Sequence, residues 1–197
     1  MNSSKEKTWK EVEKEIAPVL LDGGVGVLPT DTLYGLVGVA LDENSVERIY
    51  KIRKRDLKKP MIILISSIDE LKQFGILLNF EQKKVLKKIW PAKVSIVIEC
   101  LDKKMNHLLR GGKSLAFRMP NDKDLLSLIK KTGPLVAPSA NLAGQNPAES
   151  FGEAYKYFKD EVDFYVDNGK IKGEPSTLIQ LGNDGKFKLL RQGAVKF

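Results

Sequence analysis

Cysteine and histidine are almost absent from this sequence, and their scarcity excludes several kinds of site. Cys100 is the only cysteine and His107 the only histidine. One cysteine cannot form an internal disulfide, and the two residues together cannot build a zinc site of the usual four ligands. A hydrolase triad built on Ser139 is not expected either, because only His107 could act as its base.

Long apolar runs and the common nucleotide fingerprints are also missing. No apolar run approaches the roughly 20 residues that a membrane-spanning helix needs, and residues 1–14 do not resemble a signal peptide. The glycines of residues 23–26 precede a strand, whereas a dinucleotide fingerprint follows one. His107 stands where a P-loop ending in Gly112-Lys113-Ser114 needs its first glycine. We therefore expect a cytoplasmic protein without membrane contact and without either fingerprint.

What the chain does contain is typical of a globular protein with a basic surface. Its 197 residues are 42% hydrophobic and 29% charged, with no visible repeat or linker, so we expect a single domain over residues 1–197. The net charge of +8 favours anionic partners such as nucleotides or RNA. Lysine accounts for most of this charge and can simply be a solvated surface. The few arginines are more informative, because a guanidinium binds phosphate or carboxylate with two hydrogen bonds.

Hydrophobic periodicity predicts alternating helices and strands, with a strand-rich end. The expected helices cover residues 6–21, 45–54, 67–73, 81–89, 122–131 and 150–159. The expected strands cover residues 25–29, 61–65, 94–99, 114–118, 135–137, 163–166, 176–181 and 187–191. This order predicts an α/β fold with one twisted mixed sheet flanked by helices.

Polar residues follow several of these strands. Thr30, Asp31 and Thr32 come after the first strand, and Ser139 follows the strand at 135–137. Arg118 and Arg191 end two further strands. Each group alone could be a turn or a helix cap. Their recurrence instead favours a shared cleft at one edge of the sheet.

Residues 51–59 carry six positive charges and one negative charge at the end of a helix. Cations are favoured there by the helix dipole, so a solvated basic face is one interpretation. The other is a phosphate-binding segment, because such close cations repel one another unless an anion screens them.

With these motifs, the chain resembles the YrdC family of threonylcarbamoyl-adenylate synthases in their short form. The resemblance covers residues 23–195. It rests on segments that occur in the family's order: Pro29–Leu36, Arg53–Pro60, Trp90–Pro91, Ala116–Pro120, Gly133–Asn141, Ser176–Thr177 and Arg191–Ala194.

The resemblance implies a basic concave cavity and an enzyme that makes threonylcarbamoyl-AMP from L-threonine, bicarbonate and ATP. Mg²⁺ would arrive with the ATP, and no protein metal site is expected. Partner proteins would transfer the product to tRNA. The implied L-threonine ligands are Thr32, Arg118, Ser139 and Ser176. The implied ATP ligands are Arg55, Lys59, Ser114, Asn141 and Arg191, and the implied catalytic residues are Arg53 and Arg55.

The sequence departs from the family pattern at three points. Arg53 replaces the usual lysine, Leu64 stands where some relatives have a substrate-binding histidine, and Ser150 stands near the position of a family threonine. Two alternatives remain open. One is an RNA- or tRNA-binding module that uses the basic concavity without catalysis, although aromatic stacking residues are few. The other is the related carbamoyl-adenylate chemistry of hydrogenase-maturation proteins.

Overall fold

Nine strands form one mixed sheet, and their order across the sheet differs from their order in the chain. The structure is a computed structural model that describes residues 9–197. The strands are β1 (Gly26–Pro29), β2 (Tyr34–Val39), β3 (Ile62–Leu64), β4 (Val94–Glu99), β5 (Ser114–Arg118), β6 (Leu135–Val136), β7 (Phe164–Tyr165), β8 (Thr177–Leu181) and β9 (Phe187–Arg191). They lie in the order β7-β1-β2-β6-β3-β5-β4-β8-β9. The α/β class and the mixed sheet are as predicted.

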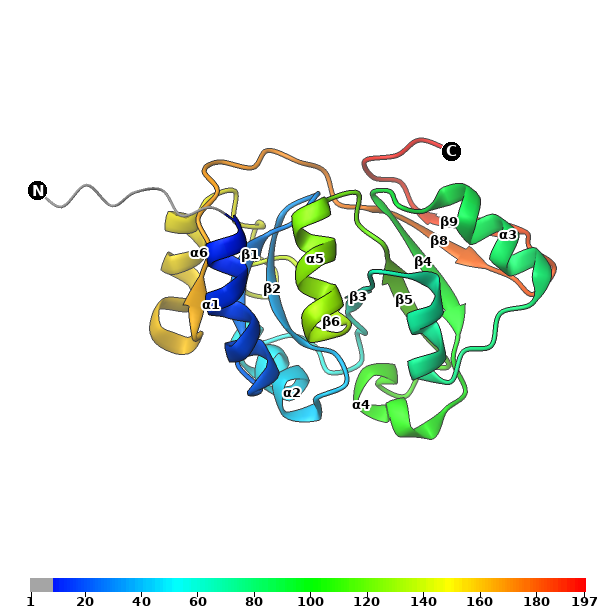
Figure 1. Ribbon diagram of the computed structural model, residues 1–197, viewed down its shortest axis with the longest axis horizontal. Coiled ribbons are helices and arrows are strands. Elements are labelled where there is room, and N and C mark those ends of the chain that lie inside the picture. Colours follow the sequence, from blue (N-terminus) through cyan, green and yellow to red (C-terminus); the bar gives the residue numbers. More distant parts are fainter. Residues whose placement is uncertain (1–8) are drawn as a thin grey trace, which may run out of the picture.

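The helices lie around this sheet (Figure 1). The α-helices are α1 (Trp9–Leu21), α2 (Glu43–Arg53), α3 (Phe80–Ile89), α4 (Asn106–Leu109), α5 (Lys123–Thr132) and α6 (Phe151–Phe158). Short 3₁₀ helices cover Ile68–Phe74, Lys103–Met105 and Lys159–Glu161. Residues 6–8 of the helix expected over 6–21 lie outside the described residues. None of the helices between residues 9 and 197 combines the length and the hydrophobicity that crossing a membrane requires.

Alternate strand residues point into two hydrophobic clusters on opposite faces of the sheet. Leu28 of β1 and Leu64 of β3 pack with α1 and α5, which lie side by side in Figure 1. Their neighbours Val27 and Ile63 pack in the larger cluster with Ile49 of α2. Helices α1 and α5 contact β1, β2, β3 and β6, and leave part of their face of the sheet uncovered near β5 and β8.

Strand β2 is the main element that the sequence did not predict. No element was predicted between the strand at 25–29 and the helix at 45–54, but residues 34–39 form a hairpin with β1. Two glycines, Gly35 and Gly38, lie in this strand, although glycines more often mark turns. Here they provide space: a Cβ atom on Gly38 would lie 3.1 Å from the Ile49 side chain, and one on Gly35 would lie 3.2 Å from Thr30. The short helix α4 was also not predicted.

Candidate active site

A cavity of about 290 Å³ opens on the face of the sheet beside α5. Small, apolar and arginine side chains line it: Thr30, Thr32, Leu33, Tyr34, Gly35, Arg53, Arg55, Pro60, Met61, Ile62, Ala116, Arg118, Ala137, Pro138, Ser139, Pro147, Pro175, Ser176, Leu178 and Arg191. Seven of the ten site residues predicted from the sequence are in this lining. The other three are Lys59, Ser114 and Asn141.

The expected arrangement at one edge of the sheet is wrong. Strands β1 and β6 run in the same direction, whereas β5 and β9 run in the opposite one. The carboxyl ends of these four strands therefore do not share an edge. The residues meet instead over the face of the sheet, where Ala116 and Leu178 form the floor of the cavity.

The β1–β2 turn supplies two buried hydroxyl groups. The Oγ1 atoms of Thr30 and Thr32 lie 3.1 Å apart, and Thr30 also donates to the Leu33 carbonyl. The backbone N–H of Thr32 donates to Thr30 Oγ1. Thr30 therefore fixes the turn, and Thr32 lines the cavity as predicted.

Arg53 ends α2 and is almost completely buried. Its Nε donates to the Asn141 carbonyl at 3.0 Å and its Nη2 to Asn141 Oδ1 at 3.0 Å. Nη1 is buried without a partner. Burial, with the nearby Arg55 charge, lowers the pKa of Arg53 to about 10. A buried cation with a free donor at a cavity is a strong attractor for an anion.

Asn141 supports Arg53 and lies outside the cavity lining. Its Oδ1 accepts from Arg53 and, at 2.6 Å, from Ser139 Oγ. Its Nδ2 donates to the carbonyls of Leu142 and Gln145. With these bonds its side chain is fully used, so it holds the guanidinium of Arg53 in place.

Arg118 ends β5 and lies deep in the cavity wall. Its Nη2 is 3.1 Å from Asp31 Oδ1 and 3.4 Å from Thr30 Oγ1. Burial lowers the pKa of Arg118, while the Asp31 charge opposes this shift. Burial raises the pKa of Asp31, against the lowering effect of Arg118. Asp31 was seen in the sequence as part of the strand-end motif, but no role was predicted for it.

Arg55 and Lys59 form a small loop structure beside the cavity. Arg55 donates from Nε to the Lys59 carbonyl at 3.0 Å and from Nη2 to the Pro60 carbonyl at 2.9 Å. The Lys59 carbonyl also accepts from the Tyr50 hydroxyl at 2.9 Å. Lys59 thus contributes its backbone here, and its side chain is outside the lining.

The far side of the cavity comes from β8 and β9. Ser176 is buried, and its Oγ lies 2.8 Å from Ser95 Oγ. Arg191 donates to the Ser176 carbonyl at 2.8 Å. These bonds join the start of β8 to the end of β9 at the cavity.

Ser114 does not reach the cavity. It shares a face of β5 with Ala116 and Arg118, because side chains alternate along a strand. It lies beyond Ala116, in a separate hollow that also contains Lys113 and Gln180. Ala116 and Leu178 of the cavity floor are themselves partly exposed.

The segment between β7 and β8 passes over the β1–β2 turn, and the sequence did not predict this. Tyr34 donates to the Gly169 carbonyl at 2.8 Å and accepts from the Asn168 N–H at 3.0 Å. A Cβ atom on Gly173 would lie 2.0 Å from the Thr32 carbonyl oxygen. Figure 1 shows this segment, in orange, crossing the top of the molecule toward β8.

The two other departures from the family pattern lie outside the lining. Leu64 is completely buried in the cluster under α1 and α5. Ser150 caps α6, where its Oγ accepts from the Glu153 N–H at 3.3 Å.

Four arginines and no aspartate or glutamate occur among the described residues that line the cavity. Groups of three or more His, Cys, Asp or Glu that could hold a metal ion do not occur within residues 9–197. The cavity therefore offers cationic and hydroxyl groups for an anionic ligand.

The arrangement has counterparts in known proteins. The family model Sua5_yciO_yrdC, described as telomere recombination, matches residues 18–193. The chain belongs to this family. It thus shares the fold of the YrdC family that the motifs resemble.

Members of the Sua5/YciO/YrdC family differ in length. The chain is 31% identical over 181 residues to a threonylcarbamoyl-AMP synthase of Pyrococcus abyssi, covering 91% of this chain and 53% of the relative. The chain thus spans about half the length of that protein. A threonylcarbamoyl-AMP synthase of Marinobacter nauticus is 28% identical over 174 residues, covering 86% of this chain and 90% of the relative.

A crystal structure of P. abyssi Sua5 complexed with L-threonine superposes with a TM-score of 0.85 at 29% identity. The match covers 96% of this chain and 56% of that one. The sheet and helices described above are therefore those of a Sua5-type domain.

Proposed function

We propose that this chain is a threonylcarbamoyl-AMP synthase, which joins L-threonine, bicarbonate and ATP and releases pyrophosphate. The main support is that one cavity is lined by Thr32, Arg118 and Ser139. Arg53 and Arg55, which are suited to binding phosphate, line the same cavity. Relatives that carry this activity in their names agree with the proposal.

In this proposal the amino acid binds between Arg118 and the β1–β2 turn. The guanidinium of Arg118 pairs with the threonine carboxylate, because Arg118 lines the cavity and its Nε has no hydrogen-bond partner in the protein. Thr32, Ser139 and Ser176 supply hydroxyl groups around the substrate.

The triphosphate then lies against Arg53, Arg55 and Arg191 on the other side of the amino acid. A cavity of about 290 Å³ is small for two substrates, because ligand pockets usually hold ~300–1,000 Å³. The nucleoside therefore extends over the open sheet face toward Ser114. We assign Asn141 to holding Arg53, and Lys59 to the loop that carries Arg55.

The reaction needs positioning and charge stabilisation more than a covalent nucleophile. The neutral threonine amine takes up CO₂ from bicarbonate and becomes a carbamate, and one water molecule is released. A carbamate oxygen attacks the α-phosphorus, and the bond to pyrophosphate breaks in line. Arg53 and Arg55 stabilise the negative charge that builds up on the leaving pyrophosphate.

Mg²⁺ enters with ATP in this proposal and is held by phosphate oxygens and water. The support is the lack of carboxylates among the described lining residues, since Asp31 is already paired with Arg118. Downstream, tRNA-modifying proteins in the cytoplasm consume the adenylate, because a mixed anhydride of this kind reacts readily with nucleophiles.

The direct test is an assay of the purified chain with L-threonine, bicarbonate and Mg·ATP. Pyrophosphate release and the adenylate product, detected by mass spectrometry, should both require threonine and bicarbonate. Pyrophosphate formation that ignores either substrate would contradict the proposal.

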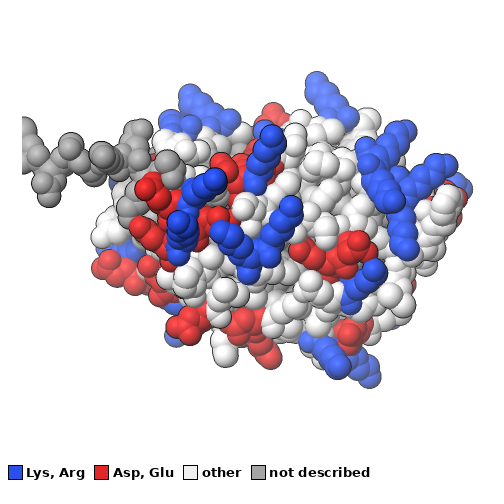
Figure 2. All heavy atoms as spheres, viewed as in Figure 1, with Lys and Arg blue, Asp and Glu red and all other residues white. Residues whose placement is uncertain are grey.

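The alternative of RNA binding without catalysis rests on charge outside the cavity. Figure 2 shows basic side chains gathered over α3, where Lys83, Lys84, Lys87 and Lys88 are exposed. Such binding would weaken steeply with salt. Strong, salt-sensitive tRNA binding by a chain that makes no pyrophosphate would favour this alternative.

Replacing Gly173 with alanine is expected to weaken threonine binding. The new Cβ atom would collide with the Thr32 carbonyl, so either the turn or the segment above it must move. A misplacement of about 1 Å at a substrate contact can reduce the rate ~100-fold, so we expect kcat/KM for threonine to fall ~10- to 100-fold.

Gly152→Ala is the matched control for this substitution. Gly152 lies in α6, and a Cβ atom there would meet no heavy atom within 4 Å. It should keep the wild-type kinetics and stabilise the helix by at most about 1 kcal/mol, since Gly152 lies in the first turn. Wild-type kinetics in the Gly173 variant as well would show that the close contact with Thr32 has no functional role.

A further inference from the structure

Asp31 and Arg118 form a buried ion pair between distant parts of the sheet. Asp31 lies in the β1–β2 turn, Arg118 ends β5, and strands β2, β6 and β3 lie between β1 and β5. The two side chains are each only 4% exposed. Among the ion pairs of residues 9–197, this is the one in which both side chains are nearly inaccessible.

The contact occupies only part of the Arg118 guanidinium. Its Nη2 faces Asp31 Oδ1 at 3.1 Å and Thr30 Oγ1 at 3.4 Å. Its Nε is buried without a hydrogen-bond partner. A guanidinium is planar, so fixing one nitrogen together with the side-chain stem also sets the direction of the remaining donors.

Arg118 is the main partner of the Asp31 carboxylate. Neither carboxylate oxygen makes a hydrogen bond of normal geometry, so the Arg118 charge is the main group that compensates it. The backbone N–H of Asn121 and the Lys93 charge also favour the charged carboxylate, and Asp122 disfavours it. Breaking such a buried pair would leave an uncompensated charge, so each side chain holds the other in place.

We propose that Asp31 is a positioning residue that orients the Arg118 guanidinium toward the carboxylate of the amino-acid substrate. This inference rests on the proposed function. Arg118 lines the cavity and Asp31 does not, so the carboxylate of Asp31 acts through the arginine and does not touch the substrate. An Asp31 that bound the substrate's ammonium group would instead have to reach the cavity itself.

Calorimetric titration of the full chain with L-threonine and with L-threoninamide separates these two roles. Asp31→Asn keeps the size of the side chain and removes its charge. We expect its Kd for L-threonine to rise about tenfold or more, because Arg118 is no longer held in the orientation that its charge-assisted contact with the carboxylate requires. The Kd for the amide, which has no carboxylate, and the KM for ATP should change less than about threefold. Asp31→Ala should raise the Kd for L-threonine further. If Asp31→Ala does not fold, the result for Asp31→Asn decides the question alone.

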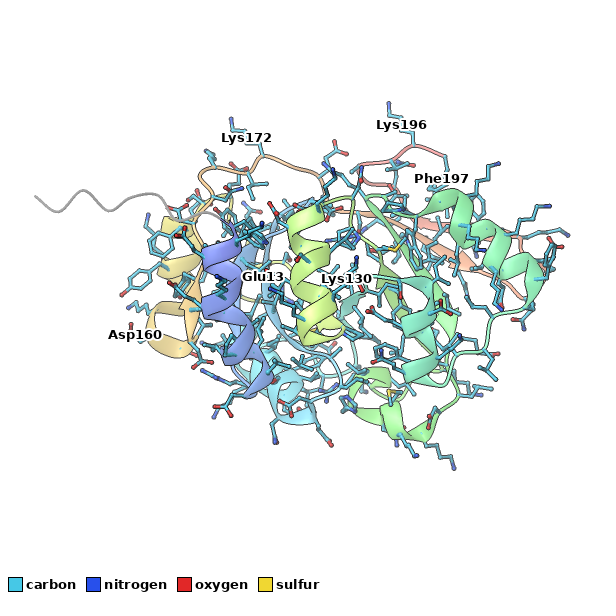
Figure 3. All side chains as sticks on the ribbon, viewed as in Figure 1. Glu13, Lys130, Asp160, Lys172, Lys196 and Phe197 are labelled. Carbon is cyan, nitrogen blue, oxygen red and sulfur yellow. The ribbon has the colours of Figure 1, made fainter. Side chains whose placement is uncertain are left out.

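Glu13→Gln is the matched control, because Glu13 is also a buried carboxylate paired with a cation. Its Oε2 lies 2.6 Å from Lys131 Nζ, and Glu13, labelled in Figure 3, sits where α1 meets α5, outside the cavity lining. This variant should change thermal stability only. Threonine affinity should stay at the wild-type value.

Three outcomes would overturn the inference. They are an unchanged threonine Kd in Asp31→Asn, an equal loss for threonine and its amide, and a parallel rise in the KM for ATP. If the wild-type chain binds threonine but makes no adenylate, the proposed function fails while the titrations still decide the role of Asp31. If it binds no threonine at all, the role assigned to Asp31 fails as well.

Discussion

Arg118→Met is expected to raise the KM for L-threonine at least ~100-fold, which corresponds to about 2.7 kcal/mol of lost binding. Methionine keeps the length of the side chain but supplies no donor for a carboxylate. The KM for ATP should change far less, because Arg53 and Arg55 remain in the cavity. Steady-state kinetics with one substrate varied at a time will measure this difference. Equal losses for both substrates would contradict the assignment of Arg118 to the amino acid.

The same substitution should make stability depend on pH. Without Arg118, burial would raise the pKa of Asp31 further above its ordinary value, since the opposing arginine charge is gone. A carboxyl group with a raised pKa in the folded state stabilises the fold at low pH, and this contribution is lost as the pH rises through that pKa. We therefore expect the free energy of unfolding of the variant to be about 3–5 kcal/mol below that of wild type near neutral pH. The difference should be smaller below pH ~4.

The double variant Asp31→Asn/Arg118→Met separates stability from binding. It removes both buried charges, so much of the lost free energy of unfolding should return. Threonine binding should stay weak, because the carboxylate still lacks its partner. Urea unfolding at pH 4 and pH 7 provides the measurement. If the double variant were no more stable than Arg118→Met at pH 7, the unpaired Asp31 would not be the cause of the stability lost in Arg118→Met.

Arg53→Met should abolish most nucleotide binding, with a loss of ~100-fold or more in affinity for ATP and pyrophosphate, or at least about 2.7 kcal/mol. Its unpartnered Nη1 and its lowered pKa mark a cation that the fold leaves uncompensated. The ligand-free variant should lose little stability, because wild type bears the cost of burying this charge. Removing the buried charge therefore favours folding, but the backbone and side-chain oxygens of Asn141 each lose a hydrogen-bond donor, which partly offsets this effect.

Pyrophosphate should therefore stabilise the wild-type protein and not the variant. A ligand at 100 times its Kd adds about 2.7 kcal/mol to the free energy of unfolding. Thermal unfolding with and without pyrophosphate measures this effect. Arg48→Met is the matched control, because Arg48 is paired with Asp163 outside the cavity lining. If Arg53→Met responded to pyrophosphate as strongly as wild type, Arg53 would not be part of the anion site.

Several elements could be predicted to the residue because their sequences contain clear boundaries. Strands β4, β5 and β9 cover the predicted residues 94–99, 114–118 and 187–191. In each, an apolar or alternating run ends at a charged or turn-forming residue. The helix α2 is capped by Asp42, whose side chain accepts from the N–H groups of Asn44 and Ser45.

Strand directions and buried pairings could not be read in the same way. Periodicity shows that a segment is a strand, but not whether it runs parallel to a strand far away in the chain. The site was therefore expected at one edge of the sheet, but the cavity lies over one face of the sheet. The ion pair of Asp31 with Arg118 joins residues 87 positions apart in the sequence, and nothing local in either segment indicates it.

The position of Arg191 at the end of an outermost strand has a consequence for dynamics. Within the described chain, β9 has β8 as its one strand neighbour, and all five of its residues are exposed. Amide protons in such a strand exchange with solvent through local fraying, well before the whole protein opens. A bound triphosphate that holds Arg191 would slow this exchange along β9. Binding in the cavity would thus be measurable as protection of the β9 amides from deuterium exchange, although Arg191 is the one residue of β9 that lines the cavity.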